Sequence, residues 1–441
     1  MLRTNVIPAL LLMSTVWPAV SQTPSGSAIT TAIVGGQVLD GSGAPPIPDG
    51  VVLIQGSRIA AVGAAGTIPI PPDAKIIQAG GMTVMPGLID MHVHLSVIGS
   101  SEGTRFVHNY LDRQEQEIMP AGARQYLMNG VTTVRDLGSP LPIVNVRDRI
   151  NRGELVGARL FVAGPMLQKR GSVDMLDRSW LVTGPEDARE KVRRLVAANV
   201  DWIKVHDQSN FSDDELTAIA DEASKAHKPM CGHAYQSDAE VVRGIRFHFK
   251  TLEHTGIGRA YEYSDATIQA IIGSDTCIDP TLVVRTMSLE TERFPARIYD
   301  QEAAAALPAD LYEHLVSSLA DYEHIPTADV DRRWSKNTRR KMEPLIRGGA
   351  CIVVGTDNSV VGLINGSTTW YEVKNFVDLG MTPMEAIEAA TSRPGHLLAP
   401  DIGTLRPGFR ADVILVKGDV LADVGLLQNV SHVLKDGVQY K

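Results

Sequence analysis

Cysteine, basic charge and long apolar runs are all scarce in this chain of 441 residues, and each scarcity excludes a class of protein. There are three cysteines, Cys231, Cys277 and Cys351, and each lies inside a predicted strand. Because the number is odd and the positions are core-like, we predict buried core residues and no disulfide framework.

Positive charge is not in excess, since the formal net charge is -9. No basic stretch is interleaved with the few aromatic residues, which make up 5% of the chain. Nucleic acid is therefore not an expected partner. The remaining composition, 44% hydrophobic and 21% charged, is ordinary for a globular protein.

The single long apolar stretch lies at the N-terminus. Residues 1–21 have the features of a signal peptide, with Arg3 as the positive end, an apolar stretch over 6–20 and small residues before position 22. The stretch is short for a membrane span and contains two prolines, so an uncleaved anchor is the weaker alternative. We predict cleavage after Ser21, a linker over 22–30, and an exported chain, periplasmic or secreted, without a membrane span.

The two ends of the remaining chain resemble each other. Residues 31–83 contain short β segments separated by turns, and residues 403–441 repeat that pattern. We predict one small β-sandwich domain built from both termini. Residues 84–402 lie between these two segments and form the main domain.

In the main domain, short apolar strands alternate with helical patterns, which predicts an α/β fold of the parallel (β/α)8 TIM-barrel type. Helix start signals occur at Ser212 and Thr382, each followed by acidic residues at capping positions. Residues 285–349 form a segment longer than one strand-to-strand crossover needs, which predicts a helical insertion. Its helices are expected near 310–322 and 331–346. It would serve as rim packing, a lid or an oligomer contact. The predicted strands are 84–95, 131–137, 160–165, 200–206, 230–235, 249–254, 277–284 and 351–357.

His92 and His94 lie one residue apart on the first predicted strand. Side chains alternate along a strand, so both imidazoles point to the same face. Two converging imidazoles form half of a transition-metal site. The alternative for an isolated pair is two hydrogen-bonded core histidines.

Lys204 interrupts the apolar strand 200–206 and shares its face with His206. Burial makes a lysine costly unless it is paired, and it lowers the pKa of the amine. A neutral amine can add carbon dioxide to form a carbamate, whose two oxygens can bridge two metal ions. The alternative is a lysine paired with an acidic neighbour.

Further polar residues stand at the ends of other predicted strands. His233 and Tyr235 share a face of the fifth strand, His254 ends the sixth and Asp357 ends the eighth. Each alone is typical of a polar residue at a barrel mouth. Together they predict a metal site, because barrel strands converge at their carboxyl ends. The predicted ligand set is His92, His94, Lys204, His233, His254 and Asp357.

These runs resemble the amidohydrolase superfamily. The matching segments are 86–94, Ile203-Lys204, His233, Glu253-His254, 355–357 and the closing stretch 403–412. The chain is similar to the exported branch that includes Xaa-Pro dipeptidases, N-acyl-amino-acid carboxypeptidases and imidazolonepropionase-related hydrolases. Residues 246–252 are bulkier and more basic than is usual in these relatives.

The resemblance implies two divalent metal ions, first of all Zn2+. His92, His94 and Asp357 would bind one ion, His233 and His254 the other, and N6-carboxylated Lys204 would bridge them. Manganese and cobalt remain open.

The implied activity is cleavage of a C–N amide bond in a dipeptide or an N-acyl amino acid by a metal-activated hydroxide. Asp357 would take up the proton of the water and deliver it to the leaving amine. Tyr235 would contact the oxyanion or only pack at the rim. His206 would touch substrate or orient a ligand, and Arg285 would bind a substrate carboxylate unless it forms a surface ion pair.

Two alternatives stay open. One is a mononuclear hydrolase of a lactam or imidazolone ring, or a deaminase, which one ion per chain would favour. The other is a non-catalytic barrel, although such proteins lose ligands and this chain has all six. We also expect a homo-oligomer.

Overall fold

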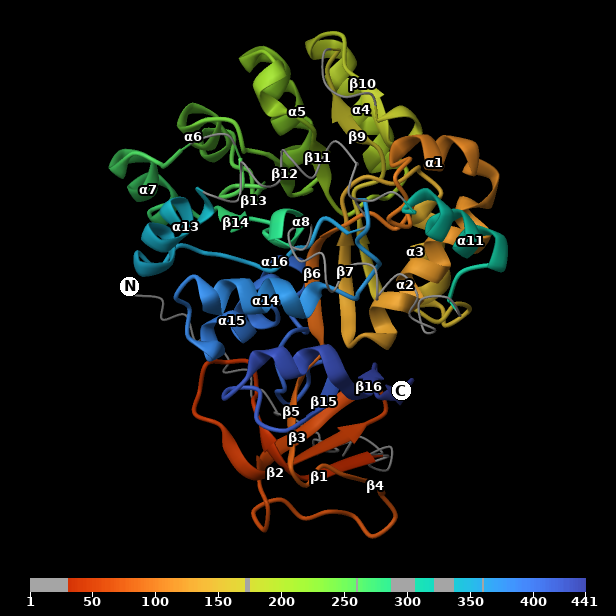
Figure 1. Ribbon diagram of the computed structural model, residues 1–441, viewed down its shortest axis with the longest axis vertical. Coiled ribbons are helices and arrows are strands. Elements are labelled where there is room, and N and C mark those ends of the chain that lie inside the picture. The colour runs from red at the N-terminus through yellow and green to blue at the C-terminus, as the bar shows by residue number, and fades with distance from the viewer. Residues whose placement is uncertain (1–30, 171–174, 259–260, 287–305, 321–336, 359–360) are drawn as a thin grey trace, which may run out of the picture.

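The computed structural model describes residues 31–170, 175–258, 261–286, 306–320, 337–358 and 361–441 (Figure 1). The signal peptide and linker predicted over 1–30 lie outside this range. No helix in the described ranges is long and apolar enough to cross a membrane. The described chain forms a β-rich part, at the bottom of Figure 1, and a larger α/β part above it.

The β-rich part combines strands from both ends of the chain in one sheet, with the order β17-β16-β15-β5-β1-β2-β3 and with β4 paired to β1. Strand β5 pairs with β1 on one side and with β15 on the other, so it joins the two chain ends. The predicted sandwich is thus a single hydrogen-bonded sheet of eight strands. The strands are β1 (Thr31–Val38), β2 (Ile47–Gln55), β3 (Arg58–Ala64), β4 (Lys75–Gln78), β5 (Met82–Pro86), β15 (Val413–Lys417), β16 (Val430–Lys435) and β17 (Val438–Gln439).

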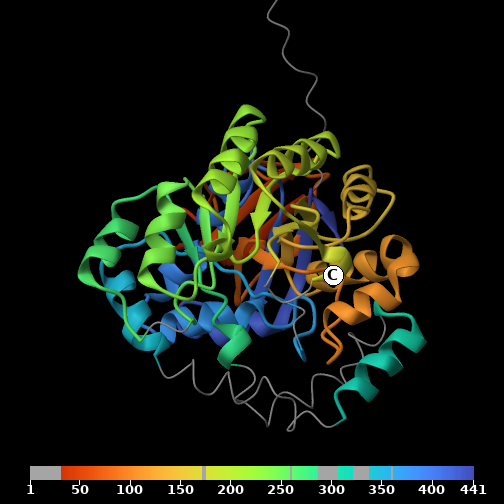
Figure 2. The ribbon, with the colours of Figure 1, turned by 90° about the horizontal axis from the view of Figure 1, so that it is seen from above.

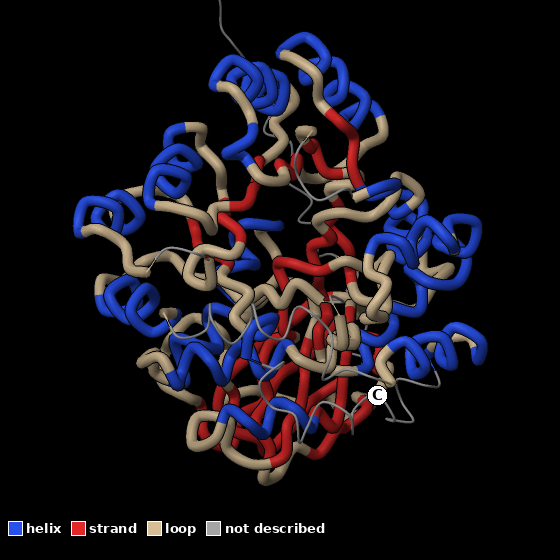
Figure 3. Tube along the Cα trace, turned by 45° about the horizontal axis from the view of Figure 1, so that its top comes forward, coloured by secondary structure: helices blue, strands red, loops and turns tan. Residues whose placement is uncertain are grey.

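The α/β part contains two parallel sheets at its centre, with helices on the outside (Figures 2 and 3). The first has the order β6-β7-β8 and the second β10-β9-β11-β12-β13-β14. Both faces of these strands are covered, which suits their continuous apolar runs. The strands are β6 (Leu88–Val93), β7 (Val131–Asp136), β8 (Arg159–Val162), β9 (Met166–Gln168), β10 (Ser179–Leu181), β11 (Ile203–Val205), β12 (Met230–His233), β13 (Thr251–Glu253) and β14 (Cys277–Asp279).

The eighth predicted strand, 351–357, is not a regular strand. It forms isolated bridges, Ile352 with Ile278 of β14 and Asn358 with Val93 of β6. On the opposite side, the amide of Asp201 donates to the carbonyl of Val162 at 2.7 Å and links β8 to the segment before β11. The regular sheets therefore do not close into a barrel, although backbone hydrogen bonds cross both gaps.

The end of the eighth segment explains its irregularity. Gly355 lies against Asp279, where a Cβ atom would come within 2.2 Å of a carboxylate oxygen. Asp357 has a φ of 54°, in the left-handed region that a β ladder does not accommodate. The close contact of Gly355 with Asp279 and the left-handed conformation of Asp357 thus interrupt regular strand pairing in this segment.

The other predicted strands are also shorter than expected, and two of them show why. The predicted strand 84–95 is divided at Pro86-Gly87, because β5 belongs to the β-rich sheet and β6 to the parallel sheet. The predicted strand 277–284 ends at Asp279, and helix α8 (Val283–Thr286) follows. Continuous apolar character did not reveal where the chain changes sheet or enters a helix.

The expectation of three unbridged cysteines is wrong. Cys277 and Cys351 form a disulfide with a Cα–Cα distance of 4.5 Å, and Cys231 remains free and buried. The two bonded cysteines begin β14 and the adjacent eighth segment, where Ile278 pairs with Ile352. An odd count could not exclude one pair, since adjacency in space decides the pairing.

Helices surround the parallel strands (Figure 2). Both predicted helix starts are confirmed, because Ser212 with Glu215 and Thr382 with Glu385 form complete capping boxes. The helices of the described ranges, besides α8, are α1 (Thr104–Asn109), α2 (Met119–Met128), α3 (Ile143–Asn151), α4 (Pro185–Ala197), α5 (Asp213–Lys225), α6 (Asp238–Arg246), α7 (Asp265–Ile272), α11 (Ala309–Ser318), α13 (Thr338–Arg347), α14 (Thr369–Asp378), α15 (Pro383–Ala389) and α16 (Ser392–Leu398).

The predicted insertion 285–349 contributes α11 and α13, and its residues 287–305 and 321–336 lie outside the described ranges. Helix α11 contacts α1, where the Tyr110 hydroxyl lies 3.3 Å from His314 Nδ1. Helix α13 lies on the other side, beside α7 (Figure 1), and the Lys341 ammonium donates to the Gly258 carbonyl at 2.7 Å. These helices pack on the rim, and α13 also supports a loop next to the site described below.

Candidate functional site

The predicted histidine ligands meet at the carboxyl ends of the parallel strands. The ring centroids of His92 and His94 lie 5.2 Å apart, and the His254 ring lies 4.9 Å from His92 and 4.6 Å from His233. His92, His94 and His233 are buried, and His254 is partly exposed. Histidines from three strands thus form one imidazole cluster.

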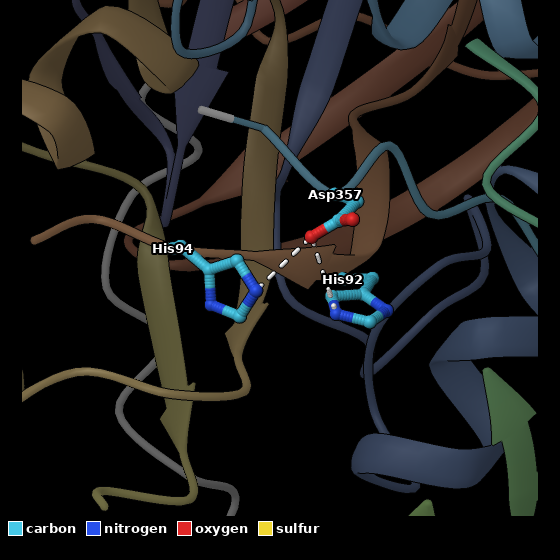
Figure 4. Close-up of side chains that lie close together, drawn as sticks. All are labelled: His92, His94 and Asp357. Atoms are coloured by element: carbon cyan, nitrogen blue, oxygen red, sulfur yellow. Dashed lines mark ion pairs between the residues drawn. The ribbon is translucent and has the colours of Figure 1, made fainter. Parts of the chain in front are cut away.

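Asp357 joins this cluster from the eighth segment (Figure 4). Its Oδ1 atom lies 3.0 Å from His94 Nε2 and 3.6 Å from His92 Nε2. The Asp357 amide donates to the His92 carbonyl at 2.7 Å, which fixes the segment against β6. Two ring nitrogens and a carboxylate oxygen therefore lie within reach of one ion.

Lys204, on β11, is fully buried. Its Nζ atom has no hydrogen-bond partner, and no carboxylate within the described ranges forms an ion pair with it. The alternative of a lysine paired with an acidic neighbour is therefore not what the structure contains.

Burial, first of all, lowers the pKa of each of the four histidines well below its ordinary value, and the charge of Lys204 adds to this. The imidazoles are thus neutral at neutral pH, which is the form that binds metal.

A divalent metal ion fits these residues. Three nitrogens of the cluster, His92 Nε2, His94 Nδ1 and Lys204 Nζ, are buried without a hydrogen-bond partner. Such atoms are costly unless a ligand satisfies them. Imidazole and carboxylate groups are the ligands that Zn2+ and similar ions accept.

The ends of the strands have unusual backbone conformations. Asp207, His254, Thr281 and Asp357 each follow a strand or the eighth segment, and each has a φ between 48° and 64°. Left-handed conformations at non-glycine residues cost about 1–3 kcal/mol and cluster at functional sites. These four residues bring the left-handed conformation to the carboxyl ends of the strands, where the histidine cluster lies.

A carboxylate beneath His92 orients its ring. Glu253 Oε2 lies 2.8 Å from His92 Nδ1, while Glu253 Oε1 accepts hydrogen bonds from Arg135 at 3.1 Å and from the Thr251 hydroxyl at 2.5 Å. Burial raises the pKa of Glu253, but the charges of Arg135 and Lys204 outweigh burial and hold it below its ordinary value. An ionised carboxylate at Nδ1 leaves Nε2 of His92 free for a metal ion.

Asp207 orients the second half of the cluster. Its Oδ1 atom lies 3.0 Å from His233 Nδ1 and accepts a hydrogen bond from the Tyr235 hydroxyl at 3.2 Å. The His206 ring lies 4.4 Å from the His233 ring, and its Nδ1 lies 3.5 Å from Asp207 Oδ2. His206 and Tyr235 thus stand next to His233, a candidate ligand.

Titration of these two neighbours is shifted in opposite directions. Burial raises the pKa of Tyr235 to about 12, so its hydroxyl remains a hydrogen-bond donor. Burial lowers the pKa of His206 to about 4, so its ring is neutral at neutral pH.

The cluster opens into a cavity of about 190 Å3, lined by His233, Tyr235, His254, Ile257, Gly258, Val284 and Asp357. Polar residues line the metal side, and Ile257 and Val284 form an apolar wall. Gly258 has no space for a side chain, since a Cβ atom would overlap the Tyr235 carbonyl. Arg285 follows Val284 in α8, and its side chain lies outside the described part of the structure.

Comparison with known proteins assigns the chain to a family. Residues 83–439 match the amidohydrolase family. The chain belongs to this family. The predicted resemblance is confirmed, and so is the expectation of a hydrolase that acts on carbon–nitrogen bonds.

Individual relatives of this amidohydrolase are distant. The chain is 26% identical to ochratoxinase of Aspergillus niger, over 93% of this chain and 86% of the relative. It is 21% identical to imidazolonepropionase of Streptomyces coelicolor, over 84% and 86% of the two chains. A solved structure described as a Xaa-Pro dipeptidase with bound methionine is 24% identical, covers 93% of this chain and 99% of its own, and gives a TM-score of 0.72.

The fold of this amidohydrolase is of the TIM-barrel type with a β-rich domain. Sequence reasoning missed the residues that orient the ligands, namely Glu253, Arg135 and Asp207. Their signals were present but indirect: a glutamate next to His254, a single arginine in the apolar β7, and an aspartate after His206. Only the spatial order of the strands shows which ligand each one contacts.

Proposed function

We propose that this chain is a binuclear, metal-dependent amidohydrolase that cleaves the C–N bond of a dipeptide or an N-acyl amino acid. The observation that carries the proposal is Lys204, buried without a partner among four neutral histidines and Asp357. One ion alone would leave Lys204 unexplained, whereas a carboxylated Lys204 would offer its two oxygens to a pair of ions.

The residues present fit two divalent ions, and zinc suits their chemistry. His92, His94 and Asp357 would hold one ion, His233 and His254 the other, with carboxylated Lys204 between them. When bound, such ions lower the pKa of a water molecule and polarise a carbonyl group.

The side chains of the protein supply the remaining steps. Asp357, whose Oδ1 faces both His92 and His94, accepts the proton of the attacking water and returns it to the leaving nitrogen. The Tyr235 hydroxyl stays protonated, and with substrate bound its one hydrogen would turn from Asp207 Oδ1 to the oxygen of the scissile carbonyl. Ile257 and Val284 exclude water on the apolar wall of the cavity.

Distant relatives support the substrate class and also keep an alternative. The names ochratoxinase and Xaa-Pro dipeptidase belong to proteins that match nearly the whole chain. The similarity to an imidazolonepropionase supports a mononuclear ring hydrolase as the second candidate. The binuclear amidohydrolase and the mononuclear ring hydrolase differ in the number of metal ions per chain, two against one.

We propose further that the chain is exported. The N-terminal sequence supports this, and so does the Cys277–Cys351 disulfide, because disulfides persist in oxidising compartments. The homo-oligomer stays a prediction.

The test of the metal centre is a Lys204→Ala variant. We expect about two ions per chain in the native protein and at most one in the variant, with amide hydrolysis reduced at least ~1,000-fold. Lys169→Ala is the control, because Lys169 forms an ion pair with Glu215 outside the site at 2.6 Å. Metal content is measured by elemental analysis and activity on dipeptides, N-acyl amino acids and lactams. Full metal content and activity in Lys204→Ala would refute the bridging role.

A further inference from the structure

One arginine near the site differs from the other buried arginines in its pairing. Arg135, Arg147, Arg159 and Arg178 are all more than nine-tenths buried. Arg135 bonds to Glu253, Arg147 to Asp201, and Arg159 to Asp412 and Asp436. Arg178 has no carboxylate partner within the described ranges, and its only hydrogen bond there is from Nε to the Gly138 carbonyl at 2.7 Å.

Within the described ranges, no contact of the fold accounts for the terminal amino groups of Arg178. A guanidinium group has five N–H donors, and the terminal amino groups form a planar fork. Burying a charge without a partner costs several kcal/mol. A buried charge without a partner among the described residues is a candidate for binding a ligand.

Arg178 lies on the His94 side of the candidate metal centre. It ends a short 3-10 helix, Leu176–Arg178, and its partner Gly138 lies just beyond β7. The Gly138 loop adjoins the His94 loop, because Asp136 accepts hydrogen bonds from the amides of both Gly138 and Leu95, at 3.1 and 2.7 Å.

Electrostatic effects agree with this position. After burial, the Arg178 charge is the largest influence that lowers the pKa of His94, and the Asp357 charge acts in turn on Arg178. These influences place the Arg178 charge close enough to His94 and Asp357 for it to act on both.

Asp136 does not account for Arg178 by itself. Its carboxylate accepts from Leu95, Gly138 and the Ser139 hydroxyl, all within 3.1 Å. It forms no ion pair with Arg178 and lies only near enough to influence its pKa. The fork of Arg178 therefore remains open to a second carboxylate.

We propose that Arg178 binds the free carboxylate of the substrate and thereby selects amino-acid leaving groups over their amides and esters. The inference rests on the proposed function and adds a specificity-determining residue to it. A carboxylate matches the guanidinium fork with two parallel hydrogen bonds. Dipeptides and N-acyl amino acids carry such a carboxylate on the carbon next to the scissile nitrogen.

The experiment compares two substrates that differ in one group, N-acetyl-L-methionine and its carboxamide. Native protein, Arg178→Met and Arg178→Lys are tested, with Arg147→Lys as a control for a buried arginine away from the site. We expect Arg178→Met to lose about 100-fold in kcat/KM on the acid, mainly through KM, and less than about threefold on the amide. Arg178→Lys keeps the charge but not the fork and is expected to fall between the two.

A second measurement does not depend on turnover. Binding of free L-methionine, followed by calorimetry, is expected to weaken about 100-fold in Arg178→Met, with metal content unchanged. Arg147→Lys is expected to bind as the native protein does.

The possible failures are distinguishable. An equal loss on acid and amide, or an equal affinity for L-methionine in native protein and Arg178→Met, overturns the role of Arg178 and leaves the amidohydrolase function intact. A metal-loaded native protein that cleaves no amide at all refutes the proposed function, and the calorimetry still decides whether Arg178 binds a carboxylate.

Discussion

The two ends of the parallel strands treat buried charge differently. At the end that faces the β-rich domain, Arg159 of β8 bonds to Asp412 and, at 2.7 Å, to Asp436, so each charge has a partner. At the carboxyl end, Lys204 and Arg178 are buried without a carboxylate within the described ranges. Paired charges join the two parts of the molecule, and unpaired ones mark the place where a ligand is expected.

Cavity size would have indicated the wrong end. The hollow near the β-rich domain measures about 570 Å3, against about 190 Å3 at the histidine cluster. Its walls include the pairs Arg159–Asp436, Arg410–Asp436 and Arg147–Asp201. Satisfied groups have little to offer a ligand, so chemistry and not volume identifies the site.

The largest effect on stability is expected from breaking a pair at the β-rich end. Arg159→Met leaves Asp412 buried without its partner and should lower the free energy of unfolding by about 3–5 kcal/mol. Urea unfolding measures this, and KM and metal content should not change, because the residue lies far from the cluster. The double variant Arg159→Met with Asp412→Asn should recover part of the loss. If Arg159→Met were as stable as the native protein, the buried charges at the two ends of the parallel strands would not differ in the way described.

A pH experiment examines a cation at the other end. Lys341 donates to the Gly258 carbonyl, and burial lowers its pKa from 10.5 to about 8. Between these pH values the unfolded chain binds more protons than the folded protein, so the free energy of unfolding should rise with pH, by at most about 1.4 kcal/mol per pH unit.

Lys341→Met isolates this effect. The difference in unfolding free energy between native protein and variant should increase in favour of the native protein from pH 8 to pH 10. A pH-independent difference would mean that the ammonium group is not desolvated in the folded protein.

The smallest effect is expected from the group that orients His92. Glu253→Gln keeps the shape but loses the carboxylate at Nδ1, and metal affinity should fall about 10- to 100-fold. Competition with a chelator measures the affinity. Lys169→Ala is again the control, because its ion pair with Glu215 lies outside the site. Unchanged affinity would show that His92 needs no carboxylate to face the ion.

The sequence could indicate which residues would lie together because the predicted ligands stand within or at the ends of apolar strands. His92 and His94 share a face through strand alternation, and Asp357 ends a run of small and apolar residues. Such signals are local, and they survive even where the eighth strand is irregular.

The missing features depend on which strands are neighbours. Arg135 and Glu253 are 118 positions apart in the sequence and meet across the inside of the fold, and the Cys277–Cys351 bond joins adjacent segments. Neither contact follows from periodicity. Arg178 was missed because it lies in a short helix after β9, outside any strand pattern.

The disulfide has a consequence for a chain cut by a protease. Cys277 and Cys351 are 74 positions apart, and the segment between them includes all of α8, α11 and α13. Hydrolysis of any peptide bond within that loop leaves the two fragments covalently joined. Such a nicked molecule would keep Asp357 tethered beside β14 and would migrate as a single chain until a reducing agent is added.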